Sequence, residues 1–214
     1  MADRGFCIEN LTITHRQQGV LLSLSARVLP GDVMSVMGPS GIGKSTLLAA
    51  ITGTLPAPFS QTGRIQLNGR DLTALPPQAR RVGILFQDHL LFPHLSVGEN
   101  LAFGLAPDLD NRRQRVCDAL ADVDLVGFED RDPATLSGGQ RARVALMRML
   151  LAEPEALLLD EPFSRLDAEL RTRMRDLVFS RAKAANLPVI LVTHDREDAV
   201  AAKGQIVELA EHRA

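Results

Sequence analysis

The sequence contains no tryptophan, no tyrosine and only two cysteines, Cys7 and Cys117. The two cysteines lie far apart, and neither has a histidine or a second cysteine at metal-ligand spacing. Two isolated thiols are typical of a reducing compartment and argue against a disulfide-stabilised secreted fold. A net charge of -2 gives no electrostatic reason to expect a nucleic-acid partner.

Long apolar runs are also absent. No stretch of the chain reaches the roughly 18 apolar residues that a membrane-spanning helix needs. The N-terminal sequence MADRGFCIEN has no basic region followed by an apolar run, so we expect no signal peptide. If this protein serves a membrane process, another chain must therefore cross the bilayer.

Short apolar runs alternate with longer amphipathic segments, which is the pattern of an α/β protein with a mainly parallel sheet. Buried strands are expected at Val33–Met37, Val82–Phe86, Leu157–Leu159 and Val189–Val192, with a last strand around Ile206–Leu209. An antiparallel subdomain is expected from a hairpin of Cys7–Ile13 and Leu22–Val28, joined by Ile65–Leu67 and followed by a turn at Asn68-Gly69.

Helices are expected after Gly43, over Ser96–Leu105, Arg112–Val123, Ser137–Leu151 and Asp167–Ala185, and after Asp195. No strand is predicted between Gln87 and about Pro154, which indicates a helical lobe inserted between two core strands. The chain is therefore predicted to be one domain, 1–214. Its core would comprise 1–87 and 155–214, and its helical subdomain 88–154.

The segment after the first predicted core strand matches the phosphate-loop pattern G-x-x-x-x-G-K-[ST] in full. The predicted nucleotide-binding residues are Gly38, Pro39, Ser40, Gly41, Ile42, Gly43, Lys44, Ser45 and Thr46. Glycines let backbone N–H groups turn toward phosphate oxygens, and the helix N-terminus adds positive charge. We expect Lys44 to reach the β- and γ-phosphates of ATP and Ser45 to bind Mg²⁺. A chance glycine-rich turn would not also stand between a strand and a helix.

Two adjacent carboxylates, Asp160 and Glu161, follow the strand of leucines at Leu157–Leu159. Acids at the carboxyl end of a buried strand face the ligand crevice of an α/β sheet. We expect Asp160 to hold Mg²⁺, directly or through water, and Glu161 to act as the catalytic base or to orient the attacking water. Alone, such a pair is more often a solvated turn or a helix cap. The upstream phosphate loop favours the catalytic interpretation.

The segment Leu136-Ser137-Gly138-Gly139-Gln140 resembles the LSGGQ signature of the ABC ATPase superfamily. From the residues alone, it could simply be a helix start capped by Ser137. The resemblance implies more. In that family the motif presents a helix N-terminus, a serine hydroxyl and glycine N–H groups to the γ-phosphate bound by a partner subunit, so the working form is a dimer.

Three further positions match this family. Gln87 corresponds to its Q-loop, which contacts Mg²⁺ and the attacking water, and His194 to the switch histidine that contacts the γ-phosphate. Asp167, in Ser164-Arg165-Leu166-Asp167, belongs to the D-loop that crosses the dimer seam. Arg165 departs from the small residue usual there, and a solvated surface arginine is the simplest interpretation.

The family usually has an aromatic residue that stacks on adenine, and this sequence has none at the corresponding Thr14-His15-Arg16-Gln17. His15 could stack as an imidazole, or Arg16 as a guanidinium plane. Either would hold the base more weakly. Alternatively, Asn10 to Gly19 is a solvated edge loop without a stacking role.

The resemblance covers essentially the whole chain. The stretch from Phe86 to Leu101 is similar to binding-protein-dependent importers, in particular to the YnjD-like group of bacterial ATPases related to thiamine, iron and sulfate systems. It implies membrane permease partners, an indirect solute-binding protein and a place at the cytoplasmic face of the inner membrane. We expect no C-terminal regulatory domain.

Other classes of nucleotide-binding protein fit the sequence less well than a transport ATPase does. DNA-acting ABC ATPases insert a long coiled coil, for which Lys44 and Leu136 are too close in sequence, and ribosome-acting members carry two ATPase domains. An ordinary nucleotide kinase would not need LSGGQ. A hydrolysis-dead regulator would not need Glu161 and His194.

Overall fold

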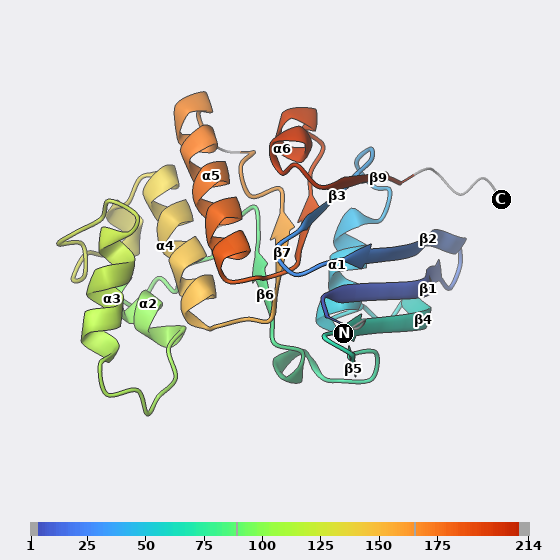
Figure 1. Cartoon of the computed structure of the whole chain (residues 1–214), viewed down its shortest axis with the longest axis horizontal. Helices are drawn as coiled ribbons and strands as arrows, with labels where there is room; N and C mark the ends of the chain where they lie inside the picture. Colours follow the sequence, from blue (N-terminus) through green and yellow to red (C-terminus); the bar gives the residue numbers. More distant parts are fainter. Residues whose placement is uncertain (1–3, 89, 165, 210–214) are drawn as a thin grey trace.

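The computed structural model describes residues 4–88, 90–164 and 166–209. These residues form two sheets flanked by helices (Figure 1). The first sheet has five parallel strands in the order β6-β7-β8-β3-β9. Its strands are β3 (Val33–Met37), β6 (Val82–Leu85), β7 (Ala156–Asp160), β8 (Val189–Val192) and β9 (Gln205–Glu208). The predicted α/β class with a mainly parallel sheet is confirmed.

Alternate residues of the parallel strands face two different cores because strand side chains alternate in direction. Leu158, Ile190 and Val36 pack with helix α1 (Lys44–Thr52) and the second sheet. Leu157, Leu159 and Leu191 pack instead with α4 (Gly138–Leu151) and α5 (Ala168–Ala184). Helices α1 and α4 therefore lie on opposite faces of the parallel sheet, as Figure 1 also shows.

The second sheet is antiparallel, in the order β2-β1-β4-β5. Its strands are β1 (Phe6–His15), β2 (Gly19–Val28), β4 (Phe59–Leu67) and β5 (Arg70–Asp71). The turn between β4 and β5 contains Asn68 and Gly69 at φ 52° and 78°, the left-handed conformation that this residue pair tolerates. Strand β1 runs to His15, so the alternative of a loop from Asn10 to Gly19 is wrong for most of its length. Pairing with β2 and β4 holds this segment extended.

The inserted helices share a core of their own, which includes Leu101, Leu120 and Val144. This core is formed by α2 (Val97–Phe103), α3 (Arg112–Ala121) and the outer face of α4. No strand occurs between β6 and β7 in the part of the chain that the structure describes, as predicted. Short 3₁₀ turns lie at Pro77–Ala79 and Pro133–Thr135, and α6 (Arg196–Ala201) follows β8.

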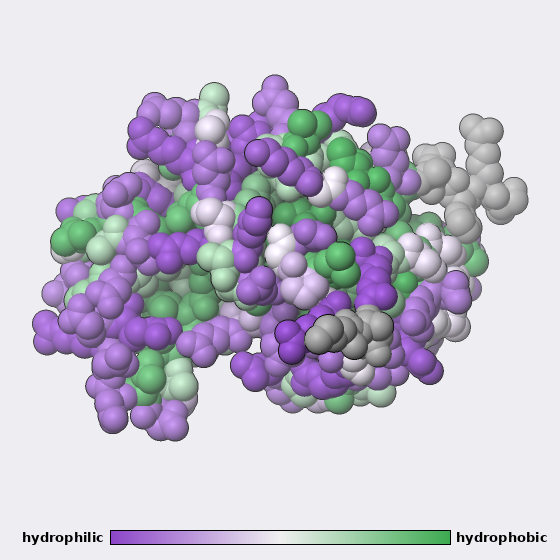
Figure 2. All heavy atoms as spheres, viewed as in Figure 1, coloured by the Kyte–Doolittle hydropathy of each residue, from purple (hydrophilic) through white to green (hydrophobic). Residues whose placement is uncertain are grey.

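Hydrophilic side chains cover most of the face in Figure 2, with smaller hydrophobic areas between them. Within 4–88, 90–164 and 166–209, no helix is long and apolar enough to cross a membrane.

Candidate nucleotide site

The phosphate loop connects β3 to α1, as predicted. Gly41 and Gly43 have φ values of 85° and 102°, which side-chain-bearing residues rarely adopt. A Cβ atom on Gly43 would also lie 2.9 Å from the Leu21 side chain of β2. Lys44 is buried, and its Nζ donates to the carbonyls of Gly38 and Pro39 at 2.7 and 2.9 Å. The loop is therefore hydrogen-bonded to the ammonium group of its own Lys44, and its backbone N–H groups lie at the start of a helix.

The carboxylate of Asp160 ends strand β7 and is partly buried. Burial raises its pKa, the neighbouring charge of Glu161 raises it further, and Lys44 partly opposes both. Ionised Asp160 is thus destabilised in this environment, and a cation beside it would restore the charged form. The carboxylate of Asp160, the hydroxyl of Ser45 and the amide of Gln87 supply hard oxygen donors, which Mg²⁺ prefers in sites it shares with phosphates. The oxygen donors of these residues are therefore of the type expected for a Mg²⁺ site.

Glu161 lies within hydrogen-bonding distance of His194, another predicted catalytic residue. Its Oε1 is 3.0 Å from Nδ1 of His194, a residue that follows the adjacent strand β8. Glu161 has φ 45°, an uncommon conformation for a non-glycine residue, and its N–H donates to Val192 in that strand. The side chain of Glu161 is only 21% exposed, whereas that of His194 is 60% exposed.

Gln87 joins the same group through Ser164. The Gln87 Nε2 donates to Ser164 Oγ at 3.2 Å, and Ser164 Oγ donates to the backbone carbonyl of Glu161 at 2.9 Å. This bridge connects two segments that are distant in sequence, the end of β6 and the loop that follows β7. No role for Ser164 could be predicted from the sequence, because a serine in a loop carries no signal for a contact with a residue as distant in sequence as Gln87.

The signature segment has a structural role within its own chain. Ser137 is the N-cap of α4: its Oγ accepts from the N–H of Gln140, while the Gln140 side chain accepts from the N–H of Ser137. This reciprocal pair is a capping box. Gly138 has open space where a Cβ would lie, whereas a Cβ on Gly139 would meet Leu170 at 2.0 Å.

The segment from Leu136 to Gln140 precedes or begins α4, which lies across the sheet from α1. The structure therefore does not bring the signature to the phosphate loop of its own chain. Asp167 caps α5 by accepting from the N–H of Leu170. Arg165, the departure noted in the D-loop, lies outside the described residues.

His15 lies in a hollow beside the phosphate loop. The hollow has a volume of about 340 Å³ and is lined by His15, Gln18 to Leu21 and Pro39 to Ile42. The imidazole packs edge-on against Phe59, with ring centroids 5.0 Å apart, and its Nδ1 accepts from the N–H of Gln17 at 3.3 Å. Phe59 is a neighbour that sequence reasoning missed, because it depends on the pairing of β1 with β4.

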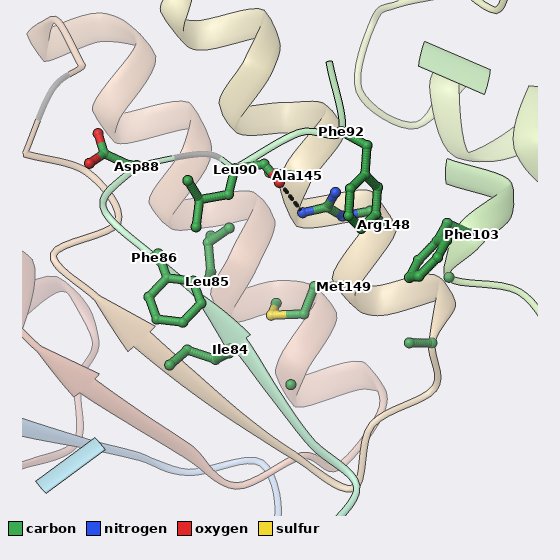
Figure 3. Close-up of a pocket in the computed structure, with 13 residues that line it drawn as sticks. Ile84, Leu85, Phe86, Asp88, Leu90, Phe92, Phe103, Ala145, Arg148 and Met149 are labelled. Carbon is green, nitrogen blue, oxygen red and sulfur yellow. Dashed lines mark hydrogen bonds between the residues drawn. The ribbon is translucent and has the colours of Figure 1, made fainter. Parts of the chain in front are cut away.

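A larger apolar groove of about 450 Å³ runs along β6 and includes Phe86 and Asp88, the residues on either side of Gln87 in the sequence (Figure 3). Phe86, Leu90 and Phe103 line it with side chains that are 43%, 62% and 66% exposed. Arg148 forms part of the wall, where its Nη2 donates to the Leu90 carbonyl at 2.6 Å. Burial lowers the pKa of Arg148. Leucine and phenylalanine exposed together in one groove are typical of a contact surface.

A glycine loop between strand and helix, with carboxylates at the end of another strand of the same parallel sheet, defines a P-loop nucleoside-triphosphatase. A family model described as ABC transporter matches residues 21–164. YnjD of Escherichia coli K12, described as an uncharacterized ABC transporter ATP-binding protein, is 48% identical over 96% of this chain and 95% of its own.

Two other relatives are import proteins by name. The thiamine import ATP-binding protein ThiQ of Ruegeria sp. TM1040 is 43% identical over 95% of this chain and 87% of its own. The Fe(3+) ions import ATP-binding protein FbpC of Mannheimia succiniciproducens is 38% identical over 96% of this chain. This chain spans 58% of the length of that FbpC. The chain belongs to the ABC transporter family, as an ATP-binding subunit with that family's ATPase domain.

Proposed function

We propose that two copies of this chain bind two ATP molecules with Mg²⁺ between them. Each site would combine the Gly38–Thr46 loop of one chain with Ser137–Gln140 of the other. The observation that carries this proposal is the position of α4 across the sheet from α1. A helix N-terminus with an open Gly138 is suited to bind an anion, and the phosphate loop of its own chain lies on the other face.

Within one chain, Lys44 and the loop N–H groups would hold the β- and γ-phosphates. Ser45, Gln87 and Asp160 would hold Mg²⁺, which supplies charge stabilisation when bound. Glu161 would orient the attacking water and accept its proton, and His194 at 3.0 Å would orient Glu161 and contact the γ-phosphate. Catalysis would then consist of positioning and electrostatics, as phosphoryl transfer requires.

His15 would pack against the base of the nucleotide in the hollow beside Pro39 to Ile42. The T-shaped contact with Phe59 supports the imidazole. We expect a weaker base contact than a larger aromatic ring would give, because an imidazole offers a smaller stacking face.

The apolar groove after Gln87 would receive a helix of a membrane permease subunit. Its side chains are exposed together, and the groove adjoins a residue of the nucleotide site, so docking there could report closure of the dimer. The subunit would thereby lie at the cytoplasmic face of a bacterial inner membrane and serve an importer supplied by a solute-binding protein. The import relatives support this direction of transport.

The dimer proposal is tested with Glu161→Gln. This variant keeps the size of the side chain but removes the carboxylate, so we expect it to bind ATP with Mg²⁺ and accumulate as a dimer in sedimentation velocity. Glu153→Gln is the matched control, because Glu153 is 72% exposed and pairs with Arg115 away from the site. A Glu161→Gln chain that stays monomeric at saturating ATP and Mg²⁺ would contradict the shared-site proposal.

The docking proposal is tested separately. Leu90→Ser and Phe103→Ser should leave the ATPase rate of the isolated subunit unchanged but reduce its copurification with the permease. Val126→Ser is the control, because Val126 is 73% exposed and does not line the groove. Equal losses for all three variants would contradict the assignment of the groove.

A further inference from the structure

A group of four charged side chains connects α5 with the segment that follows His194. Arg171 Nη1 lies 2.7 Å from Asp195 Oδ2, and Arg171 Nε lies 3.6 Å from Asp198 Oδ1. Arg175 Nη1 lies 3.2 Å from the same oxygen of Asp198. The side chain of Asp198 is 2% exposed, so this group is sheltered from solvent. Such an arrangement is costly to desolvate and is weak evidence for stability by itself.

Arg171 has a contact that Arg175 lacks. Its Nε also donates to the backbone carbonyl of Phe163 at 3.4 Å. Phe163 is buried and stands two positions after Glu161, while Asp195 directly follows His194. One guanidinium thus joins the two loops that carry Glu161 and His194. A planar group with several N–H donors can serve two acceptors in different directions at once.

Asp195 is held on both of its oxygens. Oδ1 accepts from the N–H of Glu197 and caps α6, while Oδ2 accepts from Arg171. Burial raises the pKa of Asp195, but the hydrogen bond from Glu197 and the charge of Arg171 together outweigh burial and leave the pKa below its usual range. The carboxylate is therefore charged and fixed in direction at neutral pH.

His194 itself depends on such support. Its side chain is 60% exposed, so packing does not determine its orientation. On one side, the N–H of Thr193 donates to Val36 in β3, which fixes the end of β8. On the other side, the direct support comes from Asp195 and its contact with Arg171.

We propose that Arg171 is a positioning residue for ATP hydrolysis, which holds the Glu161 loop and the His194 loop at the separation that lets the two side chains meet. This inference rests on the proposed roles of Glu161 and His194. Arg171 touches neither nucleotide nor water in this role. It acts through the carbonyl of Phe163 and the carboxylate of Asp195.

The test compares Arg171→Gln, Arg171→Lys and Asp195→Asn with the matched control Arg175→Gln, which removes a guanidinium from the same helix and the same charged group. For Arg171→Gln we expect kcat to fall by about 10- to 100-fold, because misplacement of a catalytic group by an ångström costs rates of this order. KM for ATP and the Kd of a non-hydrolysable ATP analogue should stay unchanged. A purely structural role would lower the melting temperature without this division between kcat and KM.

Arg171→Lys should recover part of the rate, since an ammonium can pair with Asp195 but does not also reach the Phe163 carbonyl. Asp195→Asn keeps a good helix cap and removes the charge facing Arg171, so it tests the contact even if Arg171→Gln fails to fold. In the Arg171→Gln, Asp195→Asn double variant, the loss of kcat should match the larger single loss, because both changes break one contact.

A wild-type kcat for Arg171→Gln or Asp195→Asn would overturn the inference. So would a double variant whose loss of kcat equals the product of the two single losses. An Arg175→Gln control that loses as much kcat as Arg171→Gln would overturn it as well. Glu161→Gln and His194→Ala separate this outcome from failure of the proposed function. If those two variants hydrolyse ATP at the wild-type rate, the catalytic assignment itself is wrong. If they abolish hydrolysis while the Arg171 variants do not impair it, only the positioning role is wrong.

Discussion

The observed role of Ser137 as a helix cap and its proposed role in an anion receptor can be separated by a single substitution. In the structure, Ser137 Oγ accepts from the N–H of Gln140 at 3.2 Å and thereby caps α4. Aspartate caps helices about as well as serine does, and its charge interacts favourably with a helix N-terminus. Ser137→Asp should therefore leave the free energy of unfolding nearly unchanged, whereas Ser137→Ala should lower it by about 1 kcal/mol.

The same substitution places a negative charge where the γ-phosphate of the partner's ATP is proposed to bind. Two unit charges about 4 Å apart repel by roughly 4 kcal/mol at an effective dielectric constant of about 20. The proposed dimer holds two such sites, and a penalty of that size would weaken the ATP-dependent dimer by about a thousandfold for each site. Ser137→Asp should thus be as stable as the wild-type chain and unable to dimerise with ATP.

Ser96 provides a matched control. It caps α2 with the same capping box, in which its Oγ accepts from the N–H of Glu99 at 3.2 Å. Ser96→Ala should lower the melting temperature by about as much as Ser137→Ala, roughly 2–4 °C for a chain of this size. Ser96→Asp should not affect dimerisation of the Glu161→Gln background, measured by sedimentation with ATP and Mg²⁺. Dimerisation of Ser137→Asp at wild-type ATP and protein concentrations would refute the anion-receptor role and leave only the cap.

Three other changes have defined outcomes. Because the pKa of Asp160 is raised in the folded chain, its ionised form destabilises that chain at pH values above this pKa. Asp160→Asn should therefore raise the melting temperature measured without nucleotide at neutral pH. The increase should become smaller as the pH is lowered. His15→Ala should weaken binding of ATP in a competition assay, and an unchanged affinity would exclude the stacking role. Arg80 donates to the carbonyls of Ala50 and Ile51 in α1 and to two part-buried carbonyls, those of Thr73 and Leu75, so Arg80→Met should cost about 3 kcal/mol in urea unfolding. Arg81→Met, at an exposed ion pair, should cost less than about 1 kcal/mol, and equal losses would contradict this account.

The fold could be predicted from the periodicity of the apolar residues, and the nucleotide site could be predicted from its motifs. Apolar runs such as Leu157–Leu159 predict buried strands because both of their faces need apolar cover, and all five predicted core strands are present. The phosphate loop could be placed because glycine spacing, strand and helix had to agree. The cap at Ser137 was predicted from the residue type, and the S-x-x-Q spacing is also that of the observed capping box with Gln140.

Contacts between distant segments could not be predicted in this way. The ring contact between Phe59 and His15 depends on the register of β1 with β4, which a single sequence does not define. The contact of Arg171 with Asp195 crosses from α5 to the start of α6, and an arginine on a helix is usually solvated. The role of such a side chain can be inferred only when the folded structure shows which residues it contacts.

The distribution of these contacts indicates where the activity would be regulated. Glu161, His194 and Gln87 already lie on connected loops of one chain, through the 3.0 Å contact and the Ser164 bridge. Ser137 lies across the sheet, so the proposed γ-phosphate contact that completes the site must arrive with a second chain. A catalytic centre built in this way would couple hydrolysis to association, because removal of the γ-phosphate removes the group that both chains hold. The apolar groove adjoining Gln87 lies where a permease subunit could follow that opening and closing.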